Sequence, residues 1–223
     1  MKLPELLHGK LIKRYKRFLA DIILDSGETI TAHVPNSGAM TSTIEADCEV
    51  WVSKSDNEKR KLAYTLELTK IGNQLICTNT NIANKIAIEA VQNGVIKELI
   101  GYDSIKPEQK YGKNSRIDIL LESGDKKCFV EVKSVTLRLD NTLAFPDAVT
   151  SRGTKHLEEL MSMVEEGYRA VMLYVIQRTD KLPFRIASEI DKKYYEKFLE
   201  VTAKGVEVLI YQAEISLEEI RIT

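Results

Sequence analysis

Residues 116–135 constrain the fold more than any other stretch, because they read as a β-hairpin with charged residues set among apolar ones. Two apolar-rich runs flank the segment SGDK at 123–126, and Gly at the first central position of a two-residue loop favours a type II′ turn. A loop at Gly124-Asp125 would place Asp118 directly opposite Glu131, with Lys133 on the same face.

Two carboxylates placed in this way repel each other, since directly opposed Cβ atoms lie roughly 4.5–5.5 Å apart. Both faces of the hairpin carry apolar residues, which indicates an interior position where charges are costly unless they are paired or bound to metal. The pattern therefore predicts a site for Mg²⁺ or Mn²⁺ at Asp118 and Glu131. The alternative is an edge hairpin with solvent-facing charges, and a bulge would shift the register. The apolar residues expected on the face away from Asp118 are Ile117, Ile119, Leu121, Val130 and Val132, whereas Leu120 and Phe129 share its face.

Composition bounds the remaining classes of protein. The chain has 223 residues, 43% of them hydrophobic and 29% charged, which suits one large or two small domains. No run approaches the roughly 18 apolar residues of a membrane span, so we expect a soluble, cytoplasmic protein with no membrane partner. The three cysteines and three histidines are scattered, which argues against disulfides, zinc and Cys-His catalysis. With a net charge of −1, nucleic acid would have to bind at local basic patches.

One such patch is the segment KLIKRYKR at residues 10–17. Cations interleaved with an aromatic ring suit a surface that follows phosphates while bases stack, as in barrels that bind single strands. A second basic cluster lies on an expected loop at 57–61. The alternatives are a charged strand edge that prevents aggregation and an ordinary solvated loop. The candidate nucleic-acid contacts in the two clusters are Lys13, Arg14, Tyr15, Lys16, Arg17, Arg60 and Lys61.

Strand-like runs at 29–34, 48–53, 62–68 and 74–77 follow the basic segment, and five short strands without a long helix favour a small OB-like barrel. The pattern becomes helical after Thr78, and Asn93-Gly94 is a good helix stop. We therefore place a domain boundary between residues 78 and 79. Glu89, at the rim of this helix's buried arc, is a candidate third acid of the metal site or else a solvated or paired residue.

Ser151 is a fair N-cap for a second helix, which would carry Arg152, Lys155 and His156 near its start. Basic residues there oppose the helix dipole, so they favour a bound anion such as phosphate over a simple solvated face. Beyond it, a buried strand at 170–177, a helix near Asp191 and a strand at 206–212 predict a right-handed crossover between parallel strands. The second domain is thus expected to be α/β.

Several motifs together resemble the sugar fermentation stimulation protein family over nearly the whole chain. They are KLIKRYKRFLADI, VPNSGAM, SDNEKRKLAYTLELT, YGKNSRIDILL, FVEVKSVTL and FPDAVTSRGTKHLEEL. The resemblance implies a DNA-binding protein of α+β class, with an OB-like barrel at residues 1–78. Residues 79–223 would then form a restriction-endonuclease-like α/β domain with a mixed sheet, similar to the PD-(D/E)xK nucleases.

The resemblance also assigns roles within the nuclease motif. Asp118 and Glu131 match its two acids, Lys133 its lysine and Glu89 the acid of the preceding helix, while Ile117 stands where the motif's name has proline. The acids, with the Val132 carbonyl, would hold Mg²⁺, and Lys133 would orient a water or stabilise developing charge.

Two functions remain open at this level. One is a metal-dependent nuclease that acts on single-stranded segments of DNA or RNA. The barrel would bind the strand and deliver it to the site. The other is a DNA-binding transcriptional regulator of sugar-metabolism genes that has a nuclease-like fold without turnover. The sequence leaves a homodimer open.

Overall fold

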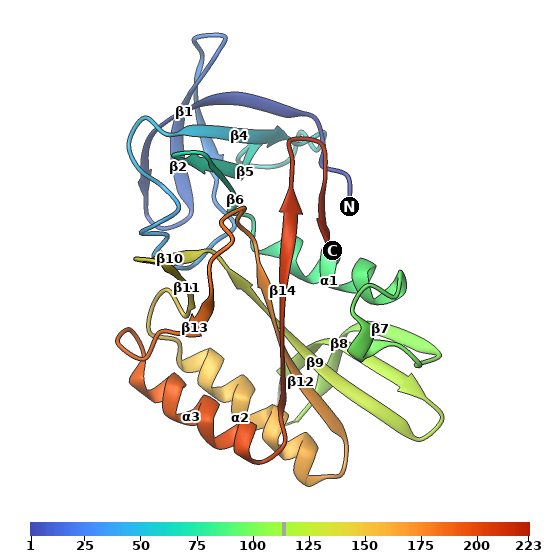
Figure 1. The fold of residues 1–223 in the computed structure, drawn as a ribbon. Coiled ribbons are helices and arrows are strands. Elements are labelled where there is room, and N and C mark those ends of the chain that lie inside the picture. The colour runs from blue at the N-terminus through green and yellow to red at the C-terminus, as the bar shows by residue number, and fades with distance from the viewer. Residues whose placement is uncertain (113–114) are drawn as a thin grey trace.

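The structure, a computed structural model, describes residues 1–112 and 115–223. Lys113 and Asn114, which belong to the YGKNSRIDILL motif, lie outside the described residues. An N-terminal barrel is followed by a curled mixed sheet with helices on both faces, as Figure 1 shows. The two termini lie near each other, and the amino group of Met1 donates to the carbonyl of Ile220 at 2.8 Å.

The N-terminal domain is a closed five-stranded barrel, as predicted, but residues 19–24 supply one of its five strands in place of the predicted run at 74–77. Its strands are β1 (Leu6–Tyr15), β2 (Leu19–Leu24), β3 (Thr29–His33), β4 (Glu49–Lys54) and β5 (Tyr64–Ile71), and β6 (Gln74–Cys77) extends the sheet beyond β5. A parallel pairing of Ala32 with Tyr64 joins β3 to β5 and closes the barrel. The side chains of Ile22, Val50 and Leu66 are fully buried inside it. Buried and more exposed residues alternate along β3, whereas β4 and β5 have runs of consecutive buried residues.

The second domain is built on a six-stranded sheet with the order β15-β14-β12-β9-β8-β7. The strands are β7 (Ser104–Tyr111), β8 (Ser115–Ser123), β9 (Lys126–Val135), β12 (Arg169–Ile176), β14 (Glu207–Ile215) and β15 (Ile220–Ile222). β12 pairs in parallel with β9 and with β14. The crossover from β12 to β14 passes through α3 (Lys192–Ala203), which confirms the predicted strand, helix, strand unit.

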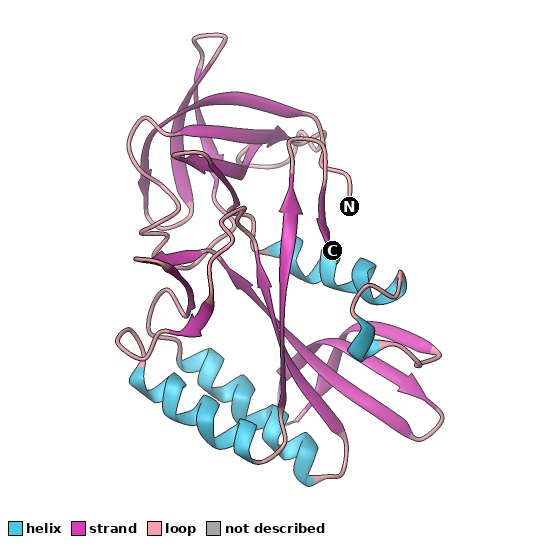
Figure 2. Ribbon diagram, viewed as in Figure 1, coloured by secondary structure: helices cyan, strands magenta, loops and turns pink. Residues whose placement is uncertain are grey.

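Helices cover both faces of this sheet (Figure 2). α1 (Asn81–Gln92) packs its buried residues, such as Ile86, against Val130 and neighbouring residues on one face. α2 (Ser151–Glu165) and α3 lie side by side on the other face, where Leu157 and Val201 share a core with Met172. The hairpin formed by β8 and β9 is therefore interior, as predicted from its two apolar faces.

The hairpin register is the predicted one from Ser123–Lys126 to Ile119–Val130, but the ladder stops there. Instead of continuing the pairing, the carboxylate of Asp118 accepts the backbone N–H of Val132 at 2.7 Å. Pairing with β7 passes from Ile119 to Ile117 without a partner for Asp118 among the described residues. The alternation of faces is interrupted at this point, and Ile117 packs with Leu120 and Phe129 rather than with Ile119. The predicted face of Ile117 was thus wrong.

The sequence analysis did not anticipate several short elements. They include β7, which pairs with β8, and β15, which pairs with β14. A separate three-stranded sheet has the order β10-β11-β13, and η1 (Lys97–Leu99) is a single 3₁₀ turn. The bounds of that sheet's strands are β10 (Leu137–Leu139), β11 (Thr142–Phe145) and β13 (Phe184–Ile186). None of the helices in the described part of the chain is long and apolar enough to cross a membrane.

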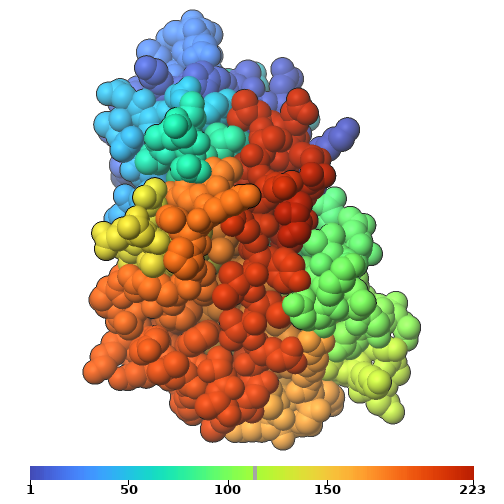
Figure 3. Space-filling model, viewed as in Figure 1, coloured from blue at the N-terminus to red at the C-terminus, as the bar shows by residue number. Residues whose placement is uncertain are grey.

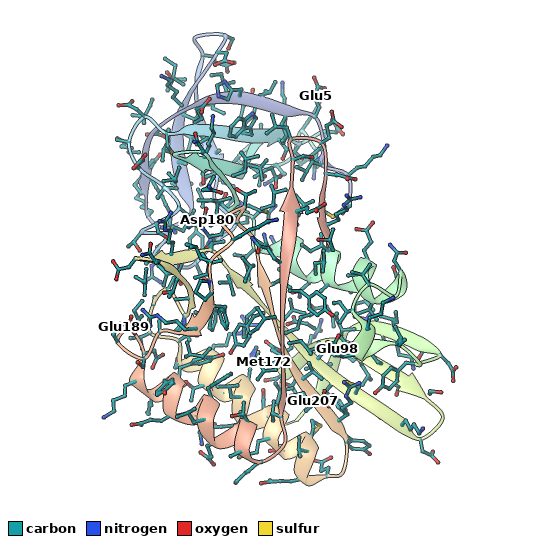
Figure 4. The ribbon with its side chains drawn as sticks, in the orientation of Figure 1. Glu5, Glu98, Met172, Asp180, Glu189 and Glu207 are labelled. Carbon is teal, nitrogen blue, oxygen red and sulfur yellow. The ribbon has the colours of Figure 1, made fainter. Side chains whose placement is uncertain are left out.

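A buried arginine of the second domain contacts both domains. Arg178, 1% exposed, contacts Asp180 at 2.5 Å and donates to the carbonyls of Ser42 in the barrel domain and Thr136 after β9, at 3.1 and 2.7 Å. Figure 4 labels Asp180 at this junction, and Figure 3 shows C-terminal segments packed directly against the barrel. Because a buried guanidinium needs all its partners, these contacts fix one domain relative to the other.

Candidate active site

A cavity of about 940 Å³ lies between the barrel domain and the sheet domain. Its walls come from the loop at residues 36–39, the start of α1, the ends of β8 and β9, the loop at 144–150 and the start of α2. The charged side chains that line it are the cations Arg14, Arg17, Lys85, Lys133 and Arg152 and the acids Glu108, Asp118, Glu131 and Asp147. The cavity thus brings the predicted nuclease motif together with basic residues from both domains.

Asp118 sits on β8 at the point where the hairpin ladder stops. Its Oδ1 accepts from the side-chain amide of Asn84 at 2.7 Å, and its Oδ2 accepts from the backbone N–H of Val132 at 2.7 Å. Burial, together with the nearby charge of Glu131, raises the pKa of Asp118 to about 6. The charge of Glu131 thus acts on Asp118, but the two residues are not a directly opposed pair of the hairpin ladder as predicted.

Glu131 is 2% exposed and its two oxygens differ in their surroundings. Oε1 accepts from Lys133 Nζ at 2.6 Å and also contacts Nδ1 of His156. Oε2 is buried and has no hydrogen-bond partner in residues 1–112 and 115–223. Burial by itself would raise the pKa of Glu131, but the positive charge of Lys133 and the contact with His156 outweigh it and lower the pKa below its usual value.

These groups fit a hard divalent cation. The described part of the chain holds no set of three or more His, Cys, Asp or Glu side chains placed to bind a metal ion. Mg²⁺ does not require one, because it is commonly held by one or two carboxylates together with waters and substrate phosphates. The oxygens that could bind it are the carboxylates of Asp118 and Glu131, and Oε2 of Glu131 has no hydrogen-bond partner among the described residues. Val132, whose carbonyl is the third predicted ligand, also lines the cavity.

The structure does not bring Glu89 to this cluster. Its carboxylate pairs with the amino group of Met1 at 2.5 Å, on the side of α1 that faces β15. Asn84 is the α1 residue that reaches Asp118, and five positions along a helix place Glu89 about 140° away from it. Sequence reasoning missed Asn84, although Asn is a poor residue for a helix interior and its presence there was a usable signal.

The predicted phosphate contacts on α2 are only partly placed at the cavity. Arg152 and His156 line it. Lys155 is not among the lining residues, because it turns to Ser115 Oγ at 3.1 Å and to the carboxylate of Glu159 at 3.4 Å. The expectation that all three residues share one anion site is therefore corrected.

The basic residues of the segment at 10–17 differ in what they contact. Arg14 is a structural brace, since it donates to the carbonyls of Asn36, Gly38 and Ala39 at 3.0–3.1 Å. Arg17 follows it in the β1–β2 turn and lines the cavity.

The remaining basic candidates lie elsewhere on the barrel. Lys13 and Tyr15 both contact Asp21, at 3.7 and 3.0 Å, so each side chain already has a partner. Lys16 is exposed at the β1–β2 turn. The exposed pair Arg60 and Lys61 lies on the loop between β4 and β5, and neither residue lines the cavity.

The loop at 36–39 is held against the second domain by a close contact. The backbone N–H of Met40 donates to Asp147 Oδ2 at 3.3 Å. Gly38 leaves no space for a side chain, because a Cβ there would lie 2.1 Å from the same oxygen of Asp147. This contact fixes the barrel loop as one wall of the cavity.

Comparison with known proteins agrees with this arrangement. Residues 12–78 match the family model described as the SfsA N-terminal OB domain, and residues 81–219 match the sugar fermentation stimulation protein RE domain. The chain belongs to the sugar fermentation stimulation protein family. Within it, the homolog from Marinomonas sp. (strain MWYL1) is 54% identical over 97% of this chain and 85% of its own length. The homolog from Maricaulis maris (strain MCS10) is 52% identical, over 97% and 93%.

A solved structure supports the family fold. It is the SfsA protein of Pyrococcus furiosus in complex with Ca²⁺, which aligns with a TM-score of 0.88 and 24% sequence identity. The alignment covers 100% of this chain and 95% of the other. The sugar fermentation stimulation fold, an OB barrel joined to a restriction-endonuclease-like sheet, thus extends over the whole chain.

Proposed function

We propose that the protein binds single-stranded nucleic acid and hydrolyses its phosphodiester bonds, with Asp118 and Glu131 holding Mg²⁺ or Mn²⁺. The observation that carries this proposal is the buried Oε2 of Glu131, a carboxylate oxygen without a protein partner among the described residues, in the same cavity as Asp118 and Lys133. Buried carboxylate oxygens of Glu159 and Asp180 also lack a partner in the described part of the chain, so what distinguishes Glu131 is its place in the cavity beside Asp118 and Lys133.

The residues of the cavity would divide the work. When bound, the cation would lower the pKa of a water and offset charge on the scissile phosphate. Asn84 and the Val132 N–H keep Asp118 in a fixed rotamer. Lys133, which contacts Glu131 at 2.6 Å, has further N–H groups to orient the attacking water or stabilise charge on the phosphate.

The size of the cavity supports a single strand as the substrate. A volume of about 940 Å³ falls in the range of about 300–1,000 Å³ found for small-ligand pockets. Arg17 from the barrel and Lys85 and Arg152 from the sheet domain would attract the phosphates of a strand that passes between the domains.

The solved relative adds a further point of support. The Pyrococcus furiosus protein is in complex with Ca²⁺. Ca²⁺ and Mg²⁺ both prefer oxygen ligands, and we propose that this chain's carboxylates take a cation of the same class.

A regulator that binds nucleic acid without cutting it is the second candidate. Its support is that both oxygens of Asp118 already have donors, Asn84 and the Val132 N–H, so this carboxylate is satisfied without a metal. Under this function the protein would bind equally well in EDTA and leave its ligand intact.

One experiment separates the two candidates. The pure protein is incubated with end-labelled single- and double-stranded DNA and RNA in the presence of Mg²⁺, Mn²⁺ or EDTA, and binding and cleavage are measured in parallel. We expect cleavage of single strands that needs metal and is lost in Asp118→Asn. Binding without cleavage under every metal condition would favour the regulator.

A further inference from the structure

His156 connects two charged groups of the cavity through its two ring nitrogens. The residue is 5% exposed, on the first turns of α2. Its Nδ1 contacts Glu131 Oε1, and its Nε2 lies 3.3 Å from the Nε of Arg152. A guanidinium has donors and no acceptor, so the contact with Arg152 requires a lone pair on Nε2. The proton of a neutral imidazole must then be on Nδ1, where Glu131 accepts it.

Lys133 acts on the same oxygen of Glu131. Its Nζ lies 2.6 Å from Oε1 and 3.2 Å from His156 Nδ1. With the proton on Nδ1, the lysine and the imidazole are two donors that share one acceptor, and they do not bond to each other. Oε1 is thus held by two donors, while Oε2 has no partner in the described residues.

We infer that His156 is a positioning residue that fixes the orientation of the Glu131 carboxylate, and that Arg152 sets the tautomer that allows it to do so. This orientation would leave Oε2 free to bind a cation, a consequence that rests on the proposed function. The second contacts of metal ligands usually act in this manner, by fixing ligand orientation.

This role replaces the phosphate contact expected for His156 from the sequence. In this tautomer its single N–H is used on Glu131 and Nε2 is an acceptor, so the ring has no donor left for a phosphate. Arg152 is exposed and, among the described residues, bonds only through Nε to the imidazole, which leaves its terminal nitrogens available to a strand. The structure therefore assigns different roles to two residues that lie one helical turn apart.

The tautomer can be measured directly by ¹⁵N NMR of the imidazole nitrogens, without metal or substrate. Signals of the three histidines are assigned with single variants. We expect His156 to show a protonated Nδ1 and an unprotonated Nε2. In Arg152→Met, which has no donor for Nε2, the signals should shift toward a mixture of tautomers. A proton on Nε2, or on both nitrogens, in the wild-type protein would overturn the inference.

Two substitutions at position 156 test the consequence for the carboxylate. The amide nitrogen of Asn can occupy the place of Nδ1 and still donate to Glu131, whereas that of Gln reaches the place of Nε2. We expect His156→Gln to weaken Mn²⁺ binding about 10- to 100-fold and His156→Asn to weaken it less. Binding of single-stranded DNA in EDTA should change in neither variant. Glu158→Gln, an exposed change on the same helix, is the matched control.

The outcomes separate the inference from the proposed function. Loss of DNA binding in EDTA with unchanged Mn²⁺ affinity would return His156 to phosphate contact and refute the positioning role. If the wild-type protein binds Mn²⁺ but never cleaves nucleic acid, the proposed function fails while the order of the two variants still tests the positioning role. If it binds no Mn²⁺, the metal proposal fails and the NMR result alone decides the tautomer.

Discussion

Replacing Asp118 with Asn tests whether the buried carboxylates destabilise the metal-free protein. The substitution preserves shape, and the amide of Asn84 can turn to offer its oxygen to the new side chain. The pKa of about 6 for Asp118 lies about 2 units above an ordinary Asp. Each unit corresponds to about 1.4 kcal/mol, so ionised Asp118 costs the fold up to about 3 kcal/mol at pH 8.

The pH dependence has a definite sign. Because the pKa of Asp118 is higher in the folded state than in the unfolded state, the folded protein binds more protons between about pH 4 and pH 6. The cost is absent below pH 4 and complete above pH 6. Without metal, the contribution of this residue to stability should therefore increase as the pH falls from 7 to 4, and Asp118→Asn should lack that dependence.

The assay is thermal unfolding of both proteins across this pH range, in EDTA and in Mg²⁺, beside a cleavage assay. In EDTA at pH 8 the variant should melt higher, by up to about 6–12 °C, since 1 kcal/mol corresponds to about 2–4 °C for a chain of this size. Mg²⁺ should raise the melting temperature of the wild type more than that of the variant, and cleavage should be lost. Asp125→Asn, at the exposed hairpin turn, is the control.

Two results would refute this reasoning. A lower melting temperature for Asp118→Asn in EDTA, with no change in its pH dependence, would show that the carboxylate is a stabilising structural group. An equal shift by Mg²⁺ in both proteins would show that Asp118 is not a ligand.

Replacing both Lys16 and Arg17 with Gln should reduce the log–log salt dependence of single-strand binding by about 1.4, at about 0.7 per phosphate contact; an unchanged slope in a titration from low to high salt would place the strand elsewhere. Gly38→Ala should cost about 1–3 kcal/mol, since its Cβ would meet Asp147. Asp147→Gly should restore part of this loss in urea unfolding, and purely additive effects would contradict the clash. Arg178→Met should lower the free energy of unfolding by about 3–5 kcal/mol, because its carboxylate partner stays buried and unpaired; a loss below 1 kcal/mol in the same assay would argue against a buried charge.

The parts of the fold that depend on local chemistry could be predicted from the sequence. The turn at Gly124-Asp125 sets the register of its own hairpin, and the apolar period of residues 82–90 sets a helix. The interruption at Asp118 could not be predicted, because it depends on a side chain that replaces a backbone partner. The alternation of side chains along a strand does not reveal that a carboxylate has replaced a backbone partner. The prediction therefore placed Ile117 on the wrong face.

The candidate site shows the same division. Proximity of Glu131 and Lys133 follows from their spacing on one strand. The sequence of the helix does not show whether Glu89 or Asn84 contacts Asp118. A helical wheel gives the buried face, but it does not show which element packs against each edge of that face. The approach of Gly38 to Asp147 joins residues more than a hundred positions apart, and no local pattern reports such a contact.

The buried contacts of Arg178 have a consequence for exchanging parts between relatives. The guanidinium is held by carbonyls from both domains, Ser42 on one side and Thr136 on the other. A chimaera that takes its barrel from one homolog and its sheet from another would combine a barrel loop and an arginine site that did not evolve together. Such chimaeras should fold only where residues 36–42 come from the same homolog as the segments around Thr136, Asp147 and Arg178. The part that must be kept together is therefore the interface between the domains rather than either domain.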